Sequence, residues 1–230
     1  MKKYKLTTET LQFAGRTLHR IKAVKDFDSI KAGEFGGWIE NEKNLSQDDN
    51  AWIYGDAMVF DNAEVYDNAK VYGNANVSGN ANVSGNAKVY GIANVFGNAN
   101  VFGNAKVYGN ANVFGYAEVY DNAKVYGNAN VSGNAEVSGN AKVYGNAAIK
   151  GDAKVHDAVD YIVFKNFWSS GRYFTWTSSN NKWSVGCFYG TGEELIKKAY
   201  ADSEKSGREY ERVVRYVESI LADEKKEKSN

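Results

Sequence analysis

The sequence has no proline, a single cysteine and only two histidines among its 230 residues. With one cysteine no internal disulfide can form, which fits a reducing compartment. Basic and acidic residues number 28 each, so net charge gives no reason to expect binding to nucleic acid or to an anionic membrane. No apolar run approaches the roughly 18 residues of a membrane span, and the start of the chain lacks a signal-peptide core. We therefore expect a cytoplasmic protein that makes no contact with a membrane.

Abundant glycine, asparagine, alanine and tyrosine reflect an internal repeat. From Ala51 to Ala158 the chain repeats every six residues as Ala-x-Val-aromatic/Ser-Gly-Asn, with an aliphatic residue in each hexad from Ile53 to Val155. Alternate residues of a strand point to opposite faces, so Ala and Val share one buried face. Gly and Asn both tolerate left-handed backbone and favour turns. Short strands joined by corners predict a three-sided solenoid of six 18-residue coils.

Residues spaced 18 apart test the three-sided prediction. The residue after the aliphatic position on one side is always tyrosine: Tyr54, Tyr72, Tyr90, Tyr108, Tyr126 and Tyr144. After Trp52, the residue before that position is always lysine: Lys70, Lys88, Lys106, Lys124 and Lys142. Two unmixed columns at this spacing predict that one outer face carries a line of lysines beside a line of tyrosines.

The hexads resemble the hexapeptide-repeat family, whose fold is the left-handed parallel β-helix. The aliphatic residue and the small residue four positions later match that family's pattern over residues 51–158. The resemblance, rather than the spacing, implies the handedness. Many members of this family are acyltransferases, and homotrimers are common among them, so the resemblance raises both as hypotheses.

The flanks do not repeat. Residues 1–50 are predicted to form short strands that cap the exposed end of the solenoid, with Ile39 and Leu45 starting an irregular first coil. Residues 159–222 are predicted to form a small α+β module of βββαα order, whose first helix has a capping box at Thr191 and Glu194. Residues 223–230 are predicted to be a charged, frayed tail. The protein is thus expected to be mainly β.

The ends of the chain resemble uncharacterised phage and prophage proteins. The similar segments are Gly-Gly-Trp-Ile-Glu (36–40), Trp-Ser-Val-Gly-Cys-Phe-Tyr-Gly-Thr-Gly-Glu-Glu-Leu-Ile (183–196) and Ala-Tyr-Ala-Asp-Ser (199–203). The resemblance implies a phage or mobile-element origin, and with it a location in the cytoplasm of a bacterial host cell. It supplies no activity and no site residues.

Catalytic and metal-binding residues are scarce. An acyltransferase of the resembled family needs a histidine base, and the chain offers only His19 in the cap and His156 on the last coil. Two histidines and one cysteine cannot build a three-histidine zinc site. Cys187 is predicted to be a buried thiol in an aromatic strand. We predict no catalytic residue, no metal and no cofactor.

The Lys/Tyr columns have three interpretations. Tyrosine ladders could simply support the sheet while lysine stems cover them. The face could pack in a homotrimer. It could also bind an acidic partner or, less favoured, the phosphate backbone of a nucleic acid. The residues assigned to this face are Lys70, Lys88, Lys106, Lys124, Lys142, Tyr72, Tyr90, Tyr108 and Tyr126, and further candidate anchors in the terminal module are Trp168, Tyr173 and Trp176.

The sequence therefore predicts a non-enzymatic, phage-type binding protein. In this hypothesis a rigid solenoid engages a protein of the bacterial host, as an anti-defence inhibitor that acts by steric blockade. One alternative is a degenerate hexapeptide-repeat acyltransferase. Another is a structural or self-assembling phage scaffold component. A homo-oligomer, with a trimer favoured, is compatible with the first hypothesis.

Overall fold

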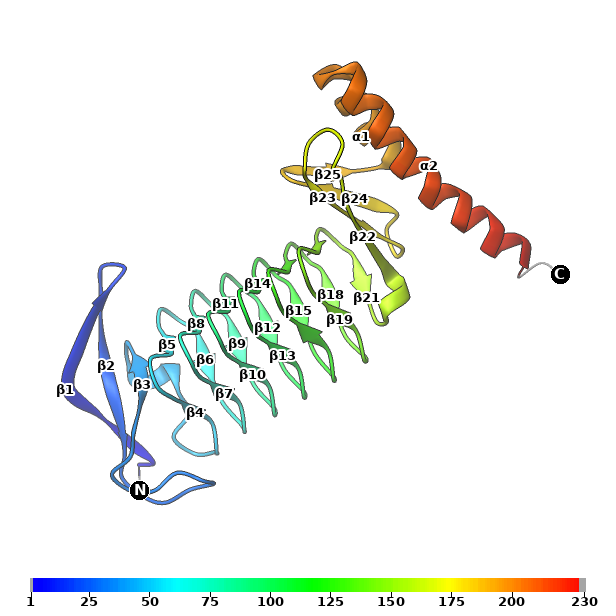
Figure 1. Ribbon diagram of the computed structural model, residues 1–230. Coiled ribbons are helices and arrows are strands. Elements are labelled where there is room, and N and C mark those ends of the chain that lie inside the picture. The colour runs from blue at the N-terminus through cyan, green and yellow to red at the C-terminus, as the bar shows by residue number, and fades with distance from the viewer. Residues whose placement is uncertain (1, 228–230) are drawn as a thin grey trace. The chain divides into compact units, whose positions relative to one another are not determined.

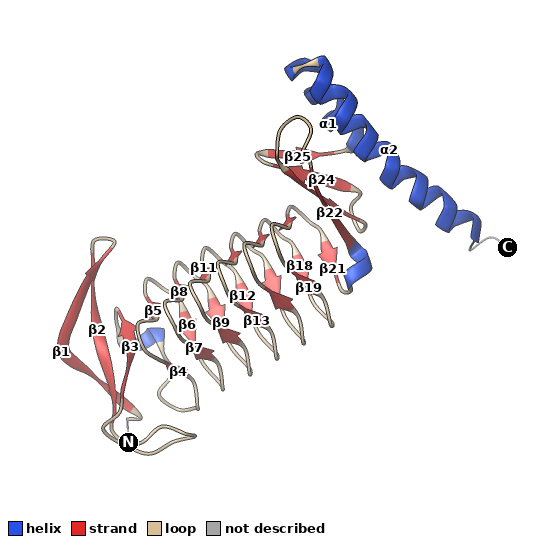
Figure 2. Ribbon diagram, viewed as in Figure 1, coloured by secondary structure: helices blue, strands red, loops and turns tan. Residues whose placement is uncertain are grey.

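The hexads form a parallel β-solenoid in the computed structural model, which describes residues 2–227 (Figure 1). The chain divides into two compact units, Met1–Asp160 and Tyr161–Asn230. The first unit contains the solenoid and the N-terminal strands, and the second contains a small sheet and two helices (Figure 2). A mainly β fold with a repeat solenoid is as predicted.

Three parallel sheets make up the three sides of the solenoid. One six-stranded sheet contains β4 (Trp52–Ile53), β7 (Lys70–Val71), β10 (Lys88–Val89), β13 (Lys106–Val107), β16 (Lys124–Val125) and β19 (Lys142–Val143). A second contains β6 (Glu64–Val65), β9 (Asn82–Val83), β12 (Asn100–Val101), β15 (Glu118–Val119), β18 (Glu136–Val137) and β21 (Lys154–Val155). The third contains β5 (Met58–Val59), β8 (Asn76–Val77), β11 (Asn94–Val95), β14 (Asn112–Val113), β17 (Asn130–Val131) and β20 (Ala148–Ile149). Neighbouring strands pair residues 18 apart, such as Lys88 with Lys106, which confirms the predicted coil length.

Alanine and valine fill the interior of the solenoid. Every hexad alanine from Ala51 to Ala153 and every aliphatic residue from Ile53 to Val155 is 0% exposed. Full burial of one valine stabilises the fold by roughly 1.5–3 kcal/mol before the entropy cost of ordering the chain. Because each coil repeats the same contacts, this stabilisation accumulates along the rod.

Glycine and asparagine have different roles at the corners of the solenoid. The glycine position has a left-handed backbone, as at Gly91 with φ +78°, and Asp61, Asp67 and Asp121 adopt the same conformation. The asparagine that follows does not have a left-handed backbone, so the corner does not require asparagine for its backbone conformation. Instead its amide bonds to the next rung, as from Asn80 Nδ2 to Asn98 Oδ1 at 2.9 Å.

The N-terminal segment adds an irregular turn to the solenoid. Its elements are β1 (Tyr4–Phe13), β2 (Arg16–Ala23), β3 (Phe35–Ile39) and the short η1 (Glu42–Asn44). Strands β1, β2 and β3 are antiparallel neighbours, and β3 joins the solenoid by pairing Ile39 with Val59. Leu45 forms a bridge with Val65. Ile39 and Leu45 thus begin the solenoid before its regular coils, as predicted.

The second unit has one more strand than expected. Strands β22 (Tyr161–Lys165), β23 (Tyr173–Thr177), β24 (Lys182–Val185) and β25 (Phe188–Gly190) form an antiparallel sheet in that order. A turn at Gly186, with φ +58°, divides the segment that was predicted to be a single strand. The helices α1 (Gly192–Asp202) and α2 (Glu204–Glu227) follow, while the short η2 (Ala158–Asp160) belongs to the first unit.

The helix boundaries agree in part with the sequence patterns. Thr191 and Glu194 form the predicted capping box of α1. Helix α2 begins at Glu204 and extends to Glu227 into the predicted tail, of which residues 228–230 lie outside the described part. No helix within residues 2–227 is long and apolar enough to cross a membrane.

Candidate functional site

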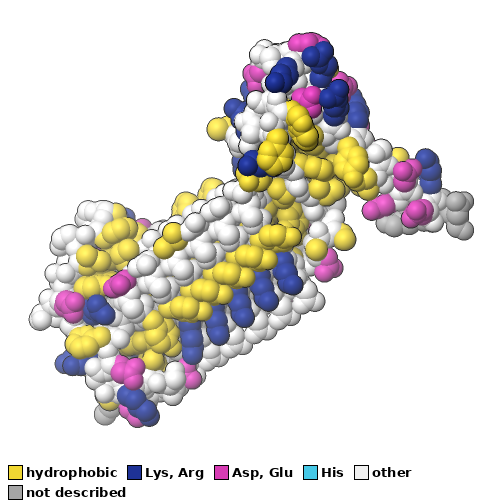
Figure 3. Space-filling view, in the orientation of Figure 1, with side chains coloured by type: hydrophobic (Ala, Val, Ile, Leu, Met, Phe, Trp, Pro, Cys, Tyr) yellow, Lys and Arg dark blue, Asp and Glu magenta, His cyan; other side chains and the backbone are white. Residues whose placement is uncertain are grey.

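The predicted lysine and tyrosine columns lie side by side on one side of the solenoid. We call this surface the Lys/Tyr face; its residues are Lys70, Lys88, Lys106, Lys124, Lys142, Tyr54, Tyr72, Tyr90, Tyr108, Tyr126 and Tyr144. Strand pairing aligns the lysines rung by rung. Figure 3 shows the face as a continuous apolar stripe beside a basic stripe. All the residues predicted for the solenoid surface are therefore brought together.

The tyrosine rings of the Lys/Tyr face stack on one another. Ring centroids are 4.7 Å apart for Tyr72 and Tyr90, 4.8 Å for Tyr90 and Tyr108, and 4.9 Å for Tyr108 and Tyr126, with ring planes within 3° of parallel. Tyr144 continues the stack at 5.3 Å, whereas Tyr54 meets Tyr72 edge-on. The ring faces are thus covered by neighbouring rings, and the hydroxyl ends and edges remain for a ligand.

Burial within this stack raises the pKa of three of its phenols. Desolvation, followed by repulsion from a neighbouring phenolate, raises the pKa of Tyr90 and Tyr108 above the ordinary value. Desolvation likewise raises the pKa of Tyr72, although the charge of Lys70 opposes the shift. Like any tyrosine hydroxyl, they are neutral at pH 7 and can donate a hydrogen bond to an acceptor.

The lysines differ in their access to an anion. Lys70, at the N-terminal end of the column, forms an ion pair with Asp28 at 2.7 Å, and this hydrogen bond raises the pKa of Lys70. Among residues 2–227, Lys88, Lys106 and Lys124 form no ion pair with a carboxylate. Two unit charges one rung apart, about 4.8 Å, repel by roughly 1 kcal/mol in water. A bound anion would relieve this repulsion.

An asparagine column borders the lysines on the side away from the tyrosines. A groove of about 470 Å³ is lined by Asn104, Asn122, Asn140, Lys106, Lys124 and Lys142. The Asn104 amide donates to Asn122 Oδ1 at 3.3 Å, which holds the amides in a row. Sequence reasoning assigned these asparagines only to turns; their own spacing of 18 was the signal that could have placed them beside the lysines.

A second hollow lies at the N-terminal end of the same face. It measures about 370 Å³ and is lined by Tyr54, Lys70, Tyr72 and Lys88. Because Tyr54 is turned edge-on to Tyr72, this end of the column leaves a ring surface next to two ammonium groups. The Lys/Tyr face therefore offers lysine nitrogens along its whole length and an open ring only at its ends.

The candidate anchors of the second unit divide into exposed and buried residues. Trp168 is 64% exposed and Tyr173 is 36% exposed, so both can reach a partner. Trp176 is 3% exposed, and its Nε1 donates to Asn181 Oδ1 at 2.9 Å. Trp176 packs in the core of the unit, and we therefore remove it from the candidate contact residues. Thr175 and Thr177, on the other face of β23, are buried as well, so both faces of this strand are covered after Tyr173.

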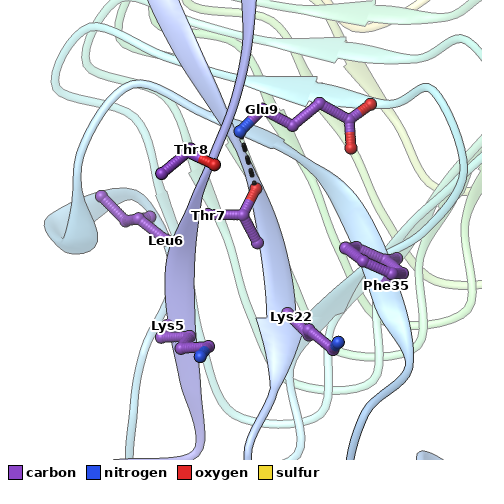
Figure 4. Close-up of a pocket in the computed structure, with 7 residues that line it drawn as sticks. All are labelled: Lys5, Leu6, Thr7, Thr8, Glu9, Lys22 and Phe35. Atoms are coloured by element: carbon purple, nitrogen blue, oxygen red, sulfur yellow. Dashed lines mark hydrogen bonds between the residues drawn. The ribbon is translucent and has the colours of Figure 1, made fainter.

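A further hollow lies on the N-terminal sheet, where sequence reasoning expected only a cap (Figure 4). It measures about 460 Å³, and its lining residues are Lys5, Leu6, Thr7, Thr8, Glu9, Lys22 and Phe35. A register shift between Leu6 and Thr10 opens it by interrupting the pairing of β1 with β2. The Lys22 ammonium lies 4.7 Å from the centre of the Phe35 ring. The hollow is broad and open, and no sequence motif marks it.

The residues considered for catalysis are separated. His156 Nδ1 lies 2.5 Å from Ser138 Oγ, and both belong to one outer column of the solenoid. Ser138 is only 2% exposed, and His19 lies in β2 of the N-terminal sheet. Among the described residues, no group of three His, Cys, Asp or Glu side chains could hold a metal ion. The Ser138–His156 pair is thus the arrangement closest to a nucleophile with its base.

Cys187 is exposed, contrary to the prediction of a buried thiol. The residue follows Gly186 in the turn between β24 and β25 rather than lying inside a strand. The prediction depended on Cys187 lying inside an aromatic strand, and the turn removes the residue from one.

Comparison with known proteins gives one informative similarity. The chain is 39% identical over 62 residues to the uncharacterized acetyltransferase YdcK of Escherichia coli (strain K12). The match covers 24% of this chain and 19% of that protein, so this chain spans a small part of that relative. No family model matches the sequence. The similarity agrees with the repeat β-helix, whereas the phage-type resemblance of the ends stays a prediction.

The similarity also corrects one prediction. We expected a protein without enzymatic activity, and this was wrong by the available comparison, because the matching relative is named as an acetyltransferase. The sequence argument depended on the scarcity of histidines and on uninterrupted hexads. These features limit how a site can be built, but they do not exclude one.

Proposed function

We propose that the protein is a binding protein whose Lys/Tyr face holds an extended anionic partner. The observation that carries the proposal is the uninterrupted row of Lys88, Lys106 and Lys124, which have no carboxylate partner among the described residues. A rigid row of like charges favours a linear partner that places several anions in line, since one rigid contact helps to position the next. This role is independent of any catalytic activity elsewhere in the chain.

Retention on an immobilised polyanion tests the proposal. The double variant Lys106→Glu/Lys124→Glu replaces two positive charges in the middle of the face with negative ones. The matched control, Lys197→Glu/Lys198→Glu, makes the same change in charge at exposed positions of α1. We expect the first variant to elute from heparin at much lower salt than the wild type, and the control to elute near the wild type. Equal elution of both variants would refute a localised binding face.

The narrower hypothesis is that the partner is a host protein and that binding blocks it sterically. Exposed Trp168 and Tyr173 support this version, because aromatic side chains dominate the energetics of many protein interfaces. Capture from a bacterial lysate with the wild type, repeated with a Trp168→Ala/Tyr173→Ala variant, tests it. A protein retained by the wild type and lost with this variant supports the hypothesis, and equal capture contradicts it.

Acyl transfer is a second candidate function, favoured by the similarity to YdcK. His156 is the candidate base, because its Nδ1 lies within hydrogen-bond distance of Ser138 Oγ. Hydrolysis of acetyl-CoA by the wild type and by a His156→Ala variant tests this candidate. A rate above background that falls in the variant supports it, whereas equal rates remove His156 from consideration.

A further inference from the structure

The stacked tyrosines restrict which anionic polymer can bind the Lys/Tyr face. Single-stranded nucleic acids gain affinity when bases stack on aromatic ring faces. Here the faces of Tyr90 and Tyr108 are covered by neighbouring rings at 4.7–4.9 Å. Only ring edges and hydroxyls remain along the middle of the column. The middle of the face therefore lacks the ring faces on which bases stack, and an open ring is left only at the ends of the column.

The spacing of the lysines restricts the polymer further. One ammonium group occurs per rung, about every 4.8 Å. An extended acidic peptide presents side chains on one face only about every 6.6 Å, and stacked B-form DNA places phosphates about every 3.4 Å along each strand. Neither period coincides with the rungs over several successive positions. A pyranose ring in an extended chain is similar in length to one rung, so charges carried on every sugar stay close to register with the lysines.

The groove next to the lysines adds donors that suit hydroxyl groups. Asn104 and Asn122 are exposed, and Asn104 uses one amide hydrogen for the ladder bond to Asn122 Oδ1. An asparagine amide has two hydrogens, so one remains for a ligand oxygen. Neutral tyrosine hydroxyls border the lysines on the other side. A polymer that carries both anions and hydroxyls would satisfy all three columns, whereas a bare polyphosphate would satisfy only one.

From this match of period and donors, we infer that the Lys/Tyr face binds an acidic polysaccharide with one carboxylate or sulfate per sugar. The chain lies along the solenoid axis. Its anions face Lys88, Lys106, Lys124 and Lys142, and its hydroxyls face the asparagine and tyrosine columns. The inference rests on the proposed function and specifies its ligand class.

Direct titration of the full-length protein with defined oligomers tests the inference. The probes are a six-sugar oligomannuronate, its three-sugar form, the uncharged six-sugar mannan and a heptathymidylate that has the same number of backbone charges as the longer uronate. We expect the six-sugar uronate to bind about fivefold more tightly than the three-sugar form, because it reaches the four lysines named above and the shorter form reaches only three, a difference of about 1 kcal/mol. The uncharged glycan and the heptathymidylate should bind more weakly than the six-sugar uronate.

Variants of the protein show whether a negative result contradicts the proposed class of ligand or the binding face itself. Lys106→Glu/Lys124→Glu should abolish uronate binding, Lys106→Gln/Lys124→Gln should weaken it, and Lys197→Glu/Lys198→Glu should leave it unchanged. If heptathymidylate binds as tightly as the uronate and responds to the same variants, the inference of an acidic polysaccharide is overturned. The proposal that the Lys/Tyr face binds an extended anion is then still supported. If no probe responds to either variant of the face, both the inference and the proposed function are overturned.

Discussion

The Nζ atom of Lys3 lies 2.9 Å from the carbonyl oxygen of Ala51 and 2.9 Å from that of Asp49. Within the solenoid, backbone N–H groups of neighbouring rungs usually bond such carbonyls, as Trp52 N does to Ala69 O. At the first rung this ladder ends, and one lysine side chain with an exposure of 1% supplies the donors. Burial lowers the pKa of Lys3, although the nearby Asp49 carboxylate opposes the shift. Lys3 is thus part of the cap that closes the solenoid.

Replacing Lys3 with methionine tests this cap. Lys3→Met keeps the apolar stem and removes the donors, so the buried hydrogen bond to Ala51 O and the partly buried one to Asp49 O are lost. We expect a loss of about 2–4 kcal/mol in the free energy of unfolding, measured in urea. Lys5→Met is the matched control, because Lys5 is exposed in the adjacent strand. A loss no larger than that of the control would mean that Lys3 does not close the ladder.

Alkaline stability depends on Tyr4 in the same cap. Its hydroxyl lies 2.7 Å from Leu45 O, and burial, with a smaller contribution from Glu42, raises its pKa well above the ordinary value near 10. The stabilisation is complete below about pH 10 and is lost as pH rises above that value, because the unfolded chain ionises first. We expect the stability difference between wild type and Tyr4→Phe to shrink from pH 8 to pH 11. A constant difference in urea unfolding would contradict this.

At a corner glycine, we expect substitution by aspartate to destabilise the protein less than substitution by alanine. A Cβ atom on Gly97, at φ +75°, would lie 3.0 Å from Gly115 N. In the same conformation Asp61 accepts a hydrogen bond from Gly79 N through its Oδ2 at 3.1 Å. We expect Gly97→Ala to cost about 1–3 kcal/mol and Gly97→Asp to cost about 1 kcal/mol less, since only aspartate provides this acceptor. Thermal unfolding measures both, and equal losses would contradict the explanation.

Two deletion variants test whether binding depends on the number of lysines or on their alignment in one column. Deletion of residues 105–122 removes one whole coil and one lysine, but the remaining columns stay aligned. Deletion of residues 111–116 keeps all five column lysines, yet it turns Lys124 and Lys142 onto another side of the solenoid. Both deletions preserve the hexad pattern, so both variants are expected to fold.

We expect the six-residue deletion to bind a polyanion more weakly than the 18-residue deletion. Two lysines are misaligned in the former and one is lost in the latter, so the difference should be roughly fivefold at about 1 kcal/mol per lysine. Calorimetric titration with the six-sugar uronate measures it. If affinity followed the number of lysines instead, the order would reverse.

The periodic part of the fold could be predicted from sequence because each hexad repeats the same local rule. Burial of Val107 follows from strand alternation, and the place of Lys106 follows from the 18-residue spacing, both without knowledge of distant contacts. The Lys/Tyr face was foreseen for this reason. The asparagine column beside it was missed, since asparagine in a corner had already been explained as a turn residue.

The non-periodic ends could not be predicted equally well, because single residues decide them. The turn at Gly186 creates an additional strand and exposes Cys187, although neither follows from hydrophobic pattern. Burial of Lys3 depends on carbonyl groups nearly 50 positions away that lack the usual donors. Trp176 is buried because both faces of β23 are covered after Tyr173, and aromatic composition alone does not reveal that packing.

Protection of individual lysines from acetylation tests the binding face most directly. The protein is treated briefly with an acylating reagent, with and without the six-sugar uronate, and each lysine is quantified by mass spectrometry. Lys88, Lys106 and Lys124 should be protected by the ligand, while Lys197 and Lys198 on α1 should react equally in both samples. Equal reactivity of all five lysines with and without ligand would contradict the account.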